Sequence, residues 1–370
     1  SLADSQRMRE AIRALELSVV VDVAMTETAR VADYVLPASS QFEKADATFF
    51  NLEFPRNGFH LRHPLFAPLS GTLPEAEIHA RFIEALGDLT ERDYAPLRRA
   101  ARLGRLPFAL AFGWASARNP RIARYAAVVL YRTLGPTLPP GLEPAASLWG
   151  VAQLYVRSNP KAAALAGFSG SPILAGNRLF DAILANPSGL IFAVSDYEDS
   201  WEAVRLPDHR INLYLAELMP ELGRIDRESL PRDPEYPFIL SAGERRGETM
   251  NTLVRDSSWH RKGAFGALRL SRADADSLGC KTGDTLKLST RRGSATVVAE
   301  VTDIMQPGHI SLPNGQGLEY RSADGRVVKA GAAPNELTDV AARDFLAGTP
   351  WHKHVPARLE RCAASVAETA

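Results

Sequence analysis

Residues 239–256 of this 370-residue chain, ILSAGERRGETMNTLVRD, join an apolar strand to a loop rich in glycine, arginine and neutral hydrogen-bond donors. Glycine lets backbone N–H groups approach an anion closely, and successive N–H groups in a turn form an anion-binding concavity. An arginine fork matches two phosphate oxygens, and a glutamate accepts from an amino group such as that of a purine. The residues that predict this chemistry are Gly243, Glu244, Arg245, Asn251 and Thr252. A solvated loop between two strands explains the same composition, so the pattern is weak alone.

A second candidate, Asp22, stands near the end of the apolar run LSVVVDV. This run predicts a central parallel strand that is buried on both faces. Ligands of open α/β sheets bind beyond the carboxyl ends of strands, so Asp22 is placed to accept two donors from a purine or a ribose. A helix N-cap or a turn acid is an equally good explanation of this aspartate.

The elements that must position these residues divide the chain into three segments. Residues 1–89 read as an α/β segment of a parallel-sheet domain, with a helix over 4–16, a short helix over 28–32 and a second strand, YVLP, ending at Pro37. A further helix over 74–87 places Ile78, Phe82 and Leu86 on one apolar face. This segment therefore predicts strands that alternate with helices.

Residues 90–235 predict a largely helical and irregular middle segment. Its arginine-rich helices indicate solvated faces, with a cluster bordering an anion funnel as the alternative. Near its end, the run from Gly176 to Trp201 predicts a helix, a turn and a strand, and the run 207–225 predicts a strand followed by a helix.

Residues 236–370 are rich in short strands bounded by glycine turns, which predicts a small closed barrel. Ser271 and Gly279 are placed to begin and end a helix. The strands TLKLST and ATVVAEV are joined by a turn at Arg292 and Gly293, and we expect Arg292 to be exposed there.

Composition limits the classes of partner. The 43 basic and 43 acidic residues cancel, so overall charge favours neither nucleic acid nor an anionic membrane. No apolar run reaches the length that crosses a bilayer, which predicts no membrane insertion. The two cysteines have no metal-ligand spacing, and Cys280 is expected to pack as a small apolar residue. Their scarcity fits a reducing compartment, so we expect a cytoplasmic protein. His60, His63 and His79 lack regularly spaced ligand partners and are interpreted as structural.

The string VVVDVAMTETARVADYVLPASSQFEKADATFFN, residues 19–51, resembles a signature of molybdopterin oxidoreductases of the dimethyl sulfoxide reductase family. Its hallmarks are the Thr-Glu-Thr-Ala turn, the Ala-Asp-x-x-Leu-Pro strand, the pair Glu43 and Lys44, and Asn51. The C-terminal segment resembles the molybdopterin-dinucleotide-binding domain of that family, a six-stranded double-psi barrel. Its closing residues PNELTDVAARDFLAGTPWHKHVPARLE include Asn335 and Lys353.

The resemblance implies a bis-molybdopterin guanine dinucleotide cofactor with molybdenum or tungsten. Asp22 and Glu75 would accept from guanine or ribose, although the family commonly has aspartate at the position of Glu75. Lys44, Arg245 and Lys353 would neutralise pyrophosphate or bind the pterin. Gly243, Glu244, Asn251, Thr252 and Asn335 would line the dinucleotide pocket. No catalytic residue or metal ligand is assigned.

The family's iron–sulfur cysteines and its metal-ligand motif do not occur in this sequence. We therefore expect the C-terminal portion of such an enzyme, inactive alone, with any iron–sulfur cluster in an N-terminal portion. The small substrate would be formate, nitrate or an S- or N-oxide. The enzyme would also have an electron-transfer partner protein. The alternatives are a cofactor-free homologue that serves as an electron-transfer or structural subunit of a respiratory complex, and an interaction module without redox function.

Overall fold

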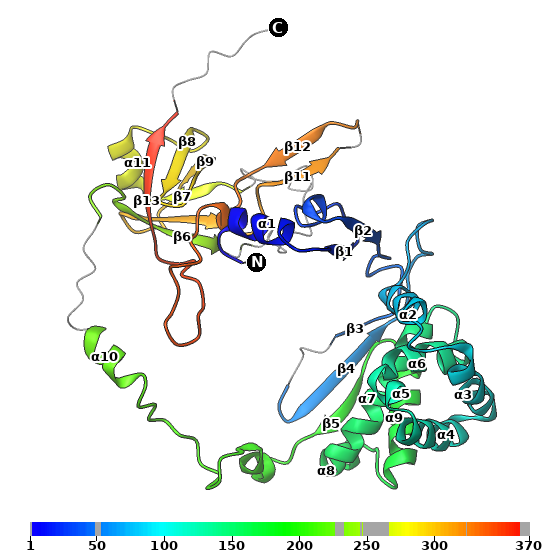
Figure 1. Cartoon of the computed structure of the whole chain (residues 1–370). Coiled ribbons are helices and arrows are strands. Elements are labelled where there is room, and N and C mark those ends of the chain that lie inside the picture. The colour runs from blue at the N-terminus through cyan, green and yellow to red at the C-terminus, as the bar shows by residue number, and fades with distance from the viewer. Residues whose placement is uncertain are drawn as a thin grey trace. The chain divides into compact units, whose positions relative to one another are not determined.

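The computed structural model describes residues 2–48, 53–225, 233–244, 246, 266–322 and 324–362 (Figure 1). The chain folds as two compact units. The first contains Ser1–Val19, Met25–Tyr34 and Glu217–Ala370, and the second contains Val20–Ala24 and Val35–Ala216. The three segments expected from the sequence, divided at residues 89 and 235, stay a prediction.

A small parallel sheet is formed by β1 (Val19–Asp22) and β2 (Tyr34–Pro37). The amides of Tyr34 and Ala38 donate to the carbonyls of Ser18 and Asp22, so the two strands run in the same direction. The prediction of a parallel pair is confirmed, but the prediction that β1 is buried on both faces is wrong. Val19 is 40% exposed, because β1 belongs to a sheet of only two strands in the described part of the chain.

An antiparallel sheet of three strands lies in the second unit, in the order β3 (Asp46–Thr48), β4 (Arg56–Arg62) and β5 (Leu190–Val194). The strand predicted after the Pro-Ser-Gly turn is β5. Leu61 of β4 and Ala193 of β5 are buried, so this sheet contributes to the apolar interior of the unit.

The middle segment is largely helical, as predicted. Its helices up to residue 185 are α3 (Glu91–Leu103), α4 (Arg105–Arg118), α5 (Pro120–Arg124), α6 (Ala126–Thr133), α7 (Ser147–Ser158), α8 (Pro160–Leu165) and α9 (Pro172–Ala185). They are preceded by α2 (Glu75–Ala85), the helix predicted over 74–87. Aromatic packing holds the layer together: Phe108 and Trp149 meet edge to face with ring centroids 5.1 Å apart. The indole N–H of Trp149 donates to buried Asn177 at 2.8 Å, which satisfies both polar groups.

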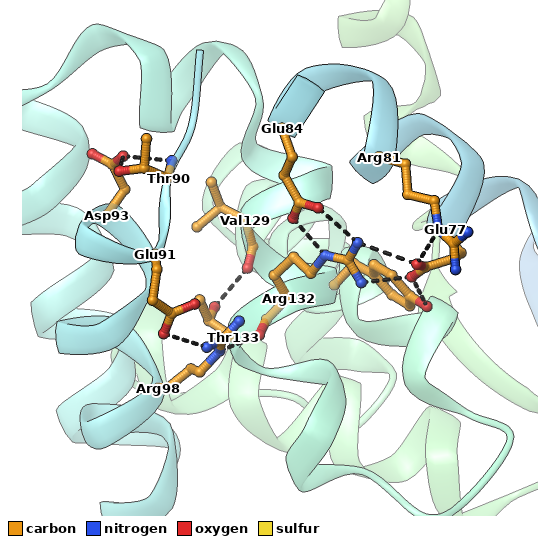
Figure 2. A network of polar contacts seen from close by, with 11 residues as sticks. Glu77, Arg81, Glu84, Thr90, Glu91, Asp93, Arg98, Val129, Arg132 and Thr133 are labelled. Carbon is orange, nitrogen blue, oxygen red and sulfur yellow. Dashed lines mark hydrogen bonds and ion pairs between the residues drawn. The ribbon is translucent and has the colours of Figure 1, made fainter. Parts of the chain in front are cut away.

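Two interpretations of helix faces in this unit are wrong. In α2, Ile78 is buried as predicted, but Phe82 and Leu86 are 45% and 73% exposed. The reason is that α2 turns Glu77 and Glu84 towards α6. There Arg132, which the sequence reading placed on a solvated face, forms ion pairs with both carboxylates (Figure 2). Apolar periodicity cannot reveal a charged residue that finds partners on another helix.

The run 207–225 also departs from its prediction. Its helix exists as α10 (Met219–Ile225), but residues 210–215 form no strand. Asp208 and Asn212 each accept from the amide two residues further on, and such local hydrogen bonds compete with a strand. Leu213 is 91% exposed and has no apolar layer over it.

The predicted closed barrel of six strands is confirmed in the first unit, and its double-psi connectivity stays a prediction. The order is β10 (His309–Pro313), β6 (Phe238–Glu244), β13 (Val355–Arg361), β8 (Thr285–Thr290), β9 (Ser294–Val301) and β7 (Leu268–Leu270). β6 runs parallel to β10, and β7 runs parallel to β9. The interior is filled by leucines, isoleucine and alanines such as Leu240, Leu288 and Ile310.

Local signals around the barrel behave as the sequence predicted. α11 (Arg272–Leu278) begins at Ser271, whose side chain accepts from the amide of Asp274, and ends at Gly279 with φ +62°. Cys280 is buried beside it, and burial raises the pKa of its thiol. The first unit also contains helix α1 (Ser5–Arg13) and an antiparallel hairpin of β11 (Leu318–Arg321) and β12 (Val327–Ala330).

The prediction that Arg292 is a free charge on a hairpin turn is wrong. The turn joins β8 and β9 as expected, but the Arg292 guanidinium forms an ion pair with Asp4, whose side chain is only 7% exposed. Asp4 is also the N-cap of α1, accepting from the amide of Arg7. Arg292 and Asp4 are 288 positions apart, so no local pattern predicts this contact.

Candidate functional site

The first candidate site lies at the carboxyl end of β6. Along β6 and β10 the register pairs Leu312 with Ala242 and then Pro313 with Glu244, so Gly243 is left out of register as a bulge. Its φ of +81° is one that glycine adopts without strain. The structure brings the predicted Lys353 to this bulge, where its ammonium donates to the carbonyls of Ala242 at 3.3 Å and Gly243 at 2.9 Å.

Glu244 follows the bulge and is held by three side chains. Its carboxylate accepts from Arg246, Arg269 and Ser311 at 3.0, 3.0 and 2.5 Å. Burial raises the pKa of Glu244, but the hydrogen bonds from Ser311 and Arg246 outweigh burial and keep the pKa below its ordinary value. Arg246 is itself almost fully buried. The cluster therefore has a structural role at the end of β6, in addition to any role in ligand binding.

Two residues that the sequence analysis did not predict follow β10: Asn314 lies beside the Gly243 bulge, and Gln316 lies beside Gly266 and Gly331. Their side-chain oxygens are buried and have no hydrogen-bond partner among the residues that the structure describes. A buried acceptor without a partner is costly, so these oxygens call for a donor from a ligand or water. The available signal was the run Pro-Asn-Gly-Gln-Gly directly after a buried strand. Gly331 makes room for Gln316, since a Cβ there would lie 2.9 Å from the Gln316 Cβ.

The second candidate site lies at the carboxyl edge of the parallel sheet. The carbonyl of Asp22 accepts from Ala38, Ala38 bridges to Leu73, and α2 begins two residues later at Glu75. The Asp22 carboxylate accepts from the amide of Val23 at 2.7 Å. The sequence-predicted Asp22 and Glu75 are thereby brought to one edge of the sheet.

Lys44 reaches the same edge, where its ammonium forms an ion pair with the Glu75 carboxylate. The Lys44 side chain is 16% exposed and that of Glu75 is 44% exposed. The neighbouring Glu43 accepts from the amides of Ser40 and Leu69, mainly the former, and this keeps its pKa below the ordinary value. A cation and a carboxylate thus stand together where the sequence predicted a nucleotide contact.

The remaining predicted residues are distributed as follows. Asn335 lies in the 3₁₀ turn η6 (Pro334–Glu336), which packs against β6. Arg245, Asn251 and Thr252, together with Asn51 of the N-terminal signature, lie outside the described residues. Among the residues that are described, no group of three or more His, Cys, Asp or Glu side chains is arranged to hold a metal ion.

His352 lies next to Lys353, and its carbonyl accepts from the amide of Ala242. Burial and the Lys353 charge lower the pKa of the His352 imidazole.

Comparison with protein-family models gives two matches. Residues 238–356 match the molydopterin dinucleotide binding domain, and residues 1–67 match the molybdopterin oxidoreductase model. The chain belongs to the molybdopterin oxidoreductase family. The β6 bulge and the barrel strands up to the start of β13 lie inside the first match, and Asp22 and Lys44 lie inside the second.

Individual members of the family extend the comparison. Dimethyl sulfoxide/trimethylamine N-oxide reductase of Cereibacter sphaeroides is 25% identical over 320 residues, which cover 84% of this chain and 34% of that protein. F420-dependent formate dehydrogenase 2 subunit alpha of Methanococcus maripaludis is 39% identical over 85 residues, covering 23% of this chain and 12% of that subunit. The chain therefore spans about a third or less of the length of these relatives.

A solved structure supports the fold alone. Acetylene hydratase from Pelobacter acetylenicus superposes with a TM-score of 0.50 and 16% sequence identity, covering 97% of this chain and 42% of that one. In the described part of this molybdopterin oxidoreductase chain, no helix is long and apolar enough to cross a membrane.

Proposed function

We propose that this chain binds the nucleotide ends of a bis-molybdopterin guanine dinucleotide and forms part of an oxidoreductase for formate, nitrate or an S- or N-oxide. The observation that carries the proposal is the β6 bulge, where the Lys353 ammonium and Asn314 lie, with Gln316 two residues further on. The side-chain oxygens of Asn314 and Gln316 are buried and have no partner within the described part of the chain. When bound, the cofactor supplies two-electron chemistry at molybdenum or tungsten. The protein binds and orients it.

The groups at the β6 bulge fit the two parts of a nucleotide tail. An ammonium has three N–H donors, and Lys353 gives two of them to the carbonyls of Ala242 and Gly243. The third can meet a pyrophosphate oxygen, whose charge the lysine also offsets. The carboxamide oxygens of Asn314 and Gln316 accept hydrogen bonds, and guanine carries the N–H donors that would satisfy them. Arg245, Asn251, Thr252 and Asn335 are proposed to complete this pocket.

The edge at β1 and β2 supports the proposal of a second nucleotide end. Asp22 and Glu75 offer carboxylate oxygens to guanine or ribose donors, and Lys44 offers a cation. In the present arrangement Lys44 and Glu75 neutralise each other. A pyrophosphate would compete for the Lys44 ammonium and free the Glu75 carboxylate to accept from the ribose or base. Two edges, each with a cation and acceptors, suit a cofactor that has two dinucleotide tails.

The test is the guanine nucleotide and metal content of the protein that contains this chain, made in a host that synthesises the cofactor. Acid hydrolysis should release guanine nucleotide, and metal analysis should find stoichiometric molybdenum or tungsten. Lys353→Met removes a charge-assisted contact worth about 1.5–3 kcal/mol, so retention of the nucleotide should fall about tenfold or more. Lys287→Met, on an outward position of β8, is the matched control.

Absence of both guanine nucleotide and metal would favour the cofactor-free alternative, an electron-transfer or structural subunit. Equal nucleotide retention in Lys353→Met and Lys287→Met would show that the β6 bulge does not hold the dinucleotide, even if the cofactor is present.

A further inference from the structure

Helix α4 carries an apolar stripe on its solvent side. Leu106, Leu110 and Trp114 are 45%, 60% and 61% exposed, and Leu103 just before the helix is 77% exposed. Their spacing of three or four residues places them on one face of a helix. The opposite face is fixed in the interior, because Phe108 of α4 is fully buried. The stripe is therefore directed outward by the packing of α4 itself.

Exposed arginines border this stripe on the neighbouring helices. Residues 97–135 contain eight arginines and no Asp, Glu or Lys, although the whole chain is neutral. Three of the eight, Arg98, Arg105 and Arg132, have carboxylate partners from outside that range. The other five are exposed at the surface of α3, α4 and α5 and form no ion pair within the described residues; they are Arg99, Arg102, Arg118, Arg121 and Arg124.

The arrangement joins the two kinds of side chain into one surface. α3 and α5 both pack against α4. The Arg118 guanidinium stacks on the Trp114 ring, with 4.0 Å between its central carbon and the ring centroid. We name the stripe and the five arginines together the arginine–leucine face.

We propose that the arginine–leucine face docks this chain on the surface of an anionic lipid bilayer. A bilayer presents phosphate anions above an apolar layer, and the face presents guanidinium groups around leucines and a tryptophan. At 1.5 Å per residue the 14 residues of α4 extend about 21 Å, which suits a helix lying in the interface plane. This binding would be peripheral. The neutral net charge of the chain does not indicate it, because the acidic residues lie outside residues 97–135.

Charge and composition favour lipid over other anionic partners. A nucleic acid would match the arginines but offers no apolar layer for three exposed leucines. A protein partner would need an apolar groove with an acidic rim, and specific interfaces also use hydrogen bonds. The outward side chains Leu106, Pro107, Leu110 and Ala117 of α4 have no polar group for such bonds, and only Trp114 and Arg118 at its C-terminal end carry donors. A fluid apolar layer requires none.

The test is co-sedimentation of the purified chain with vesicles of phosphatidylcholine, alone or mixed with phosphatidylglycerol. Binding is expected only to the mixed vesicles and should weaken in high salt. Each arginine near an anionic surface changes affinity about fivefold, so Arg99→Gln/Arg102→Gln should bind about 30-fold more weakly. Leu106→Gln/Leu110→Gln should also release the chain. The controls are Arg272→Gln/Arg326→Gln and Ile304→Gln, which change exposed residues of the first unit.

A second readout locates the contact. Brominated lipid should quench part of the tryptophan fluorescence of the bound chain, and Trp114→Phe should abolish most of that quenching. Circular dichroism of every variant establishes that the fold is retained. Absence of binding to mixed vesicles would overturn the proposal, and so would equal binding by the arginine variant and its control. Self-association or a protein complex that Leu106→Gln/Leu110→Gln abolishes, without vesicle binding, would assign the face to a protein partner instead.

Discussion

Replacing Arg132 by methionine tests whether its ion pairs hold the helical unit together. The guanidinium donates to Glu77 at 2.5 Å and to Glu84 at 2.7 Å, and Tyr131 donates to the same Glu77 at 3.0 Å (Figure 2). The exposed fractions of the Arg132, Glu77 and Glu84 side chains are 20%, 15% and 32%. Arg132→Met keeps a long apolar side chain but leaves the Glu84 carboxylate without its cation and the Glu77 carboxylate with only the exposed Arg81.

The expected loss follows from burial. Removing one partner of a fully buried ion pair costs about 3–5 kcal/mol, and partial exposure here points to the lower end, about 3 kcal/mol. For a unit of this size 1 kcal/mol changes the melting temperature by about 2–4 °C, so we expect a decrease of about 6–12 °C by circular dichroism. The matched control is Arg81→Met, which removes an exposed pair with the same Glu77 and should cost about 0.5 kcal/mol or less.

The loss should also depend on pH. Burial raises the pKa of Glu77, but hydrogen bonds from Arg132, Arg81 and Tyr131 outweigh burial and lower it below the ordinary value. A carboxyl with a lowered folded-state pKa stabilises the fold above its unfolded-state pKa of about 4.3, and this contribution disappears as pH falls through the folded-state pKa. The difference between Arg132→Met and the native chain should be largest at neutral pH and shrink below about pH 4. Equal losses for Arg132→Met and Arg81→Met, or a difference independent of pH, would refute the reasoning.

Three further outcomes are expected. Asp4→Asn should destabilise the first unit by about 1–3 kcal/mol at neutral pH, and by less under acid, because the hydrogen bond from Arg292 lowers the Asp4 pKa; urea unfolding at two pH values measures both. Arg245→Ala should reduce bound guanine nucleotide and Arg245→Lys should restore only part of it, with exposed Arg326→Ala as the control; equal nucleotide content in all three would count against a pyrophosphate contact. Cys280 should react with iodoacetamide more slowly than Cys362 until the fold is unfolded, as mass spectrometry of the labelled chain can show.

Much of the architecture was predictable because it depends on short-range patterns. The strand ending at Pro37, the α11 boundaries at Ser271 and Gly279, and the closed barrel each follow from turn and capping residues next to apolar runs. Such signals act between residues near one another in the chain, so a single sequence contains them. The family resemblance placed Lys353 at the dinucleotide-binding end, and the structure adds its contact with Gly243.

Other features required the tertiary structure. Arg292 forms an ion pair with Asp4, which is near the other end of the sequence. Arg132 forms ion pairs with Glu77 and Glu84 of another helix. Asn314 and Gln316 became candidates only because the fold buries their side-chain oxygens away from every donor of the described residues. The exposed apolar stripe on α4 and the arginines around it also required the structure, because composition does not say which side chains share one surface.

The sequence by itself therefore determined the family, the barrel and the helical middle, whereas the tertiary structure decided which charges are paired and which are left facing solvent. The physical reason is that hydrogen bonds in turns and caps act locally, while the partner of a buried charge is chosen by packing between distant elements.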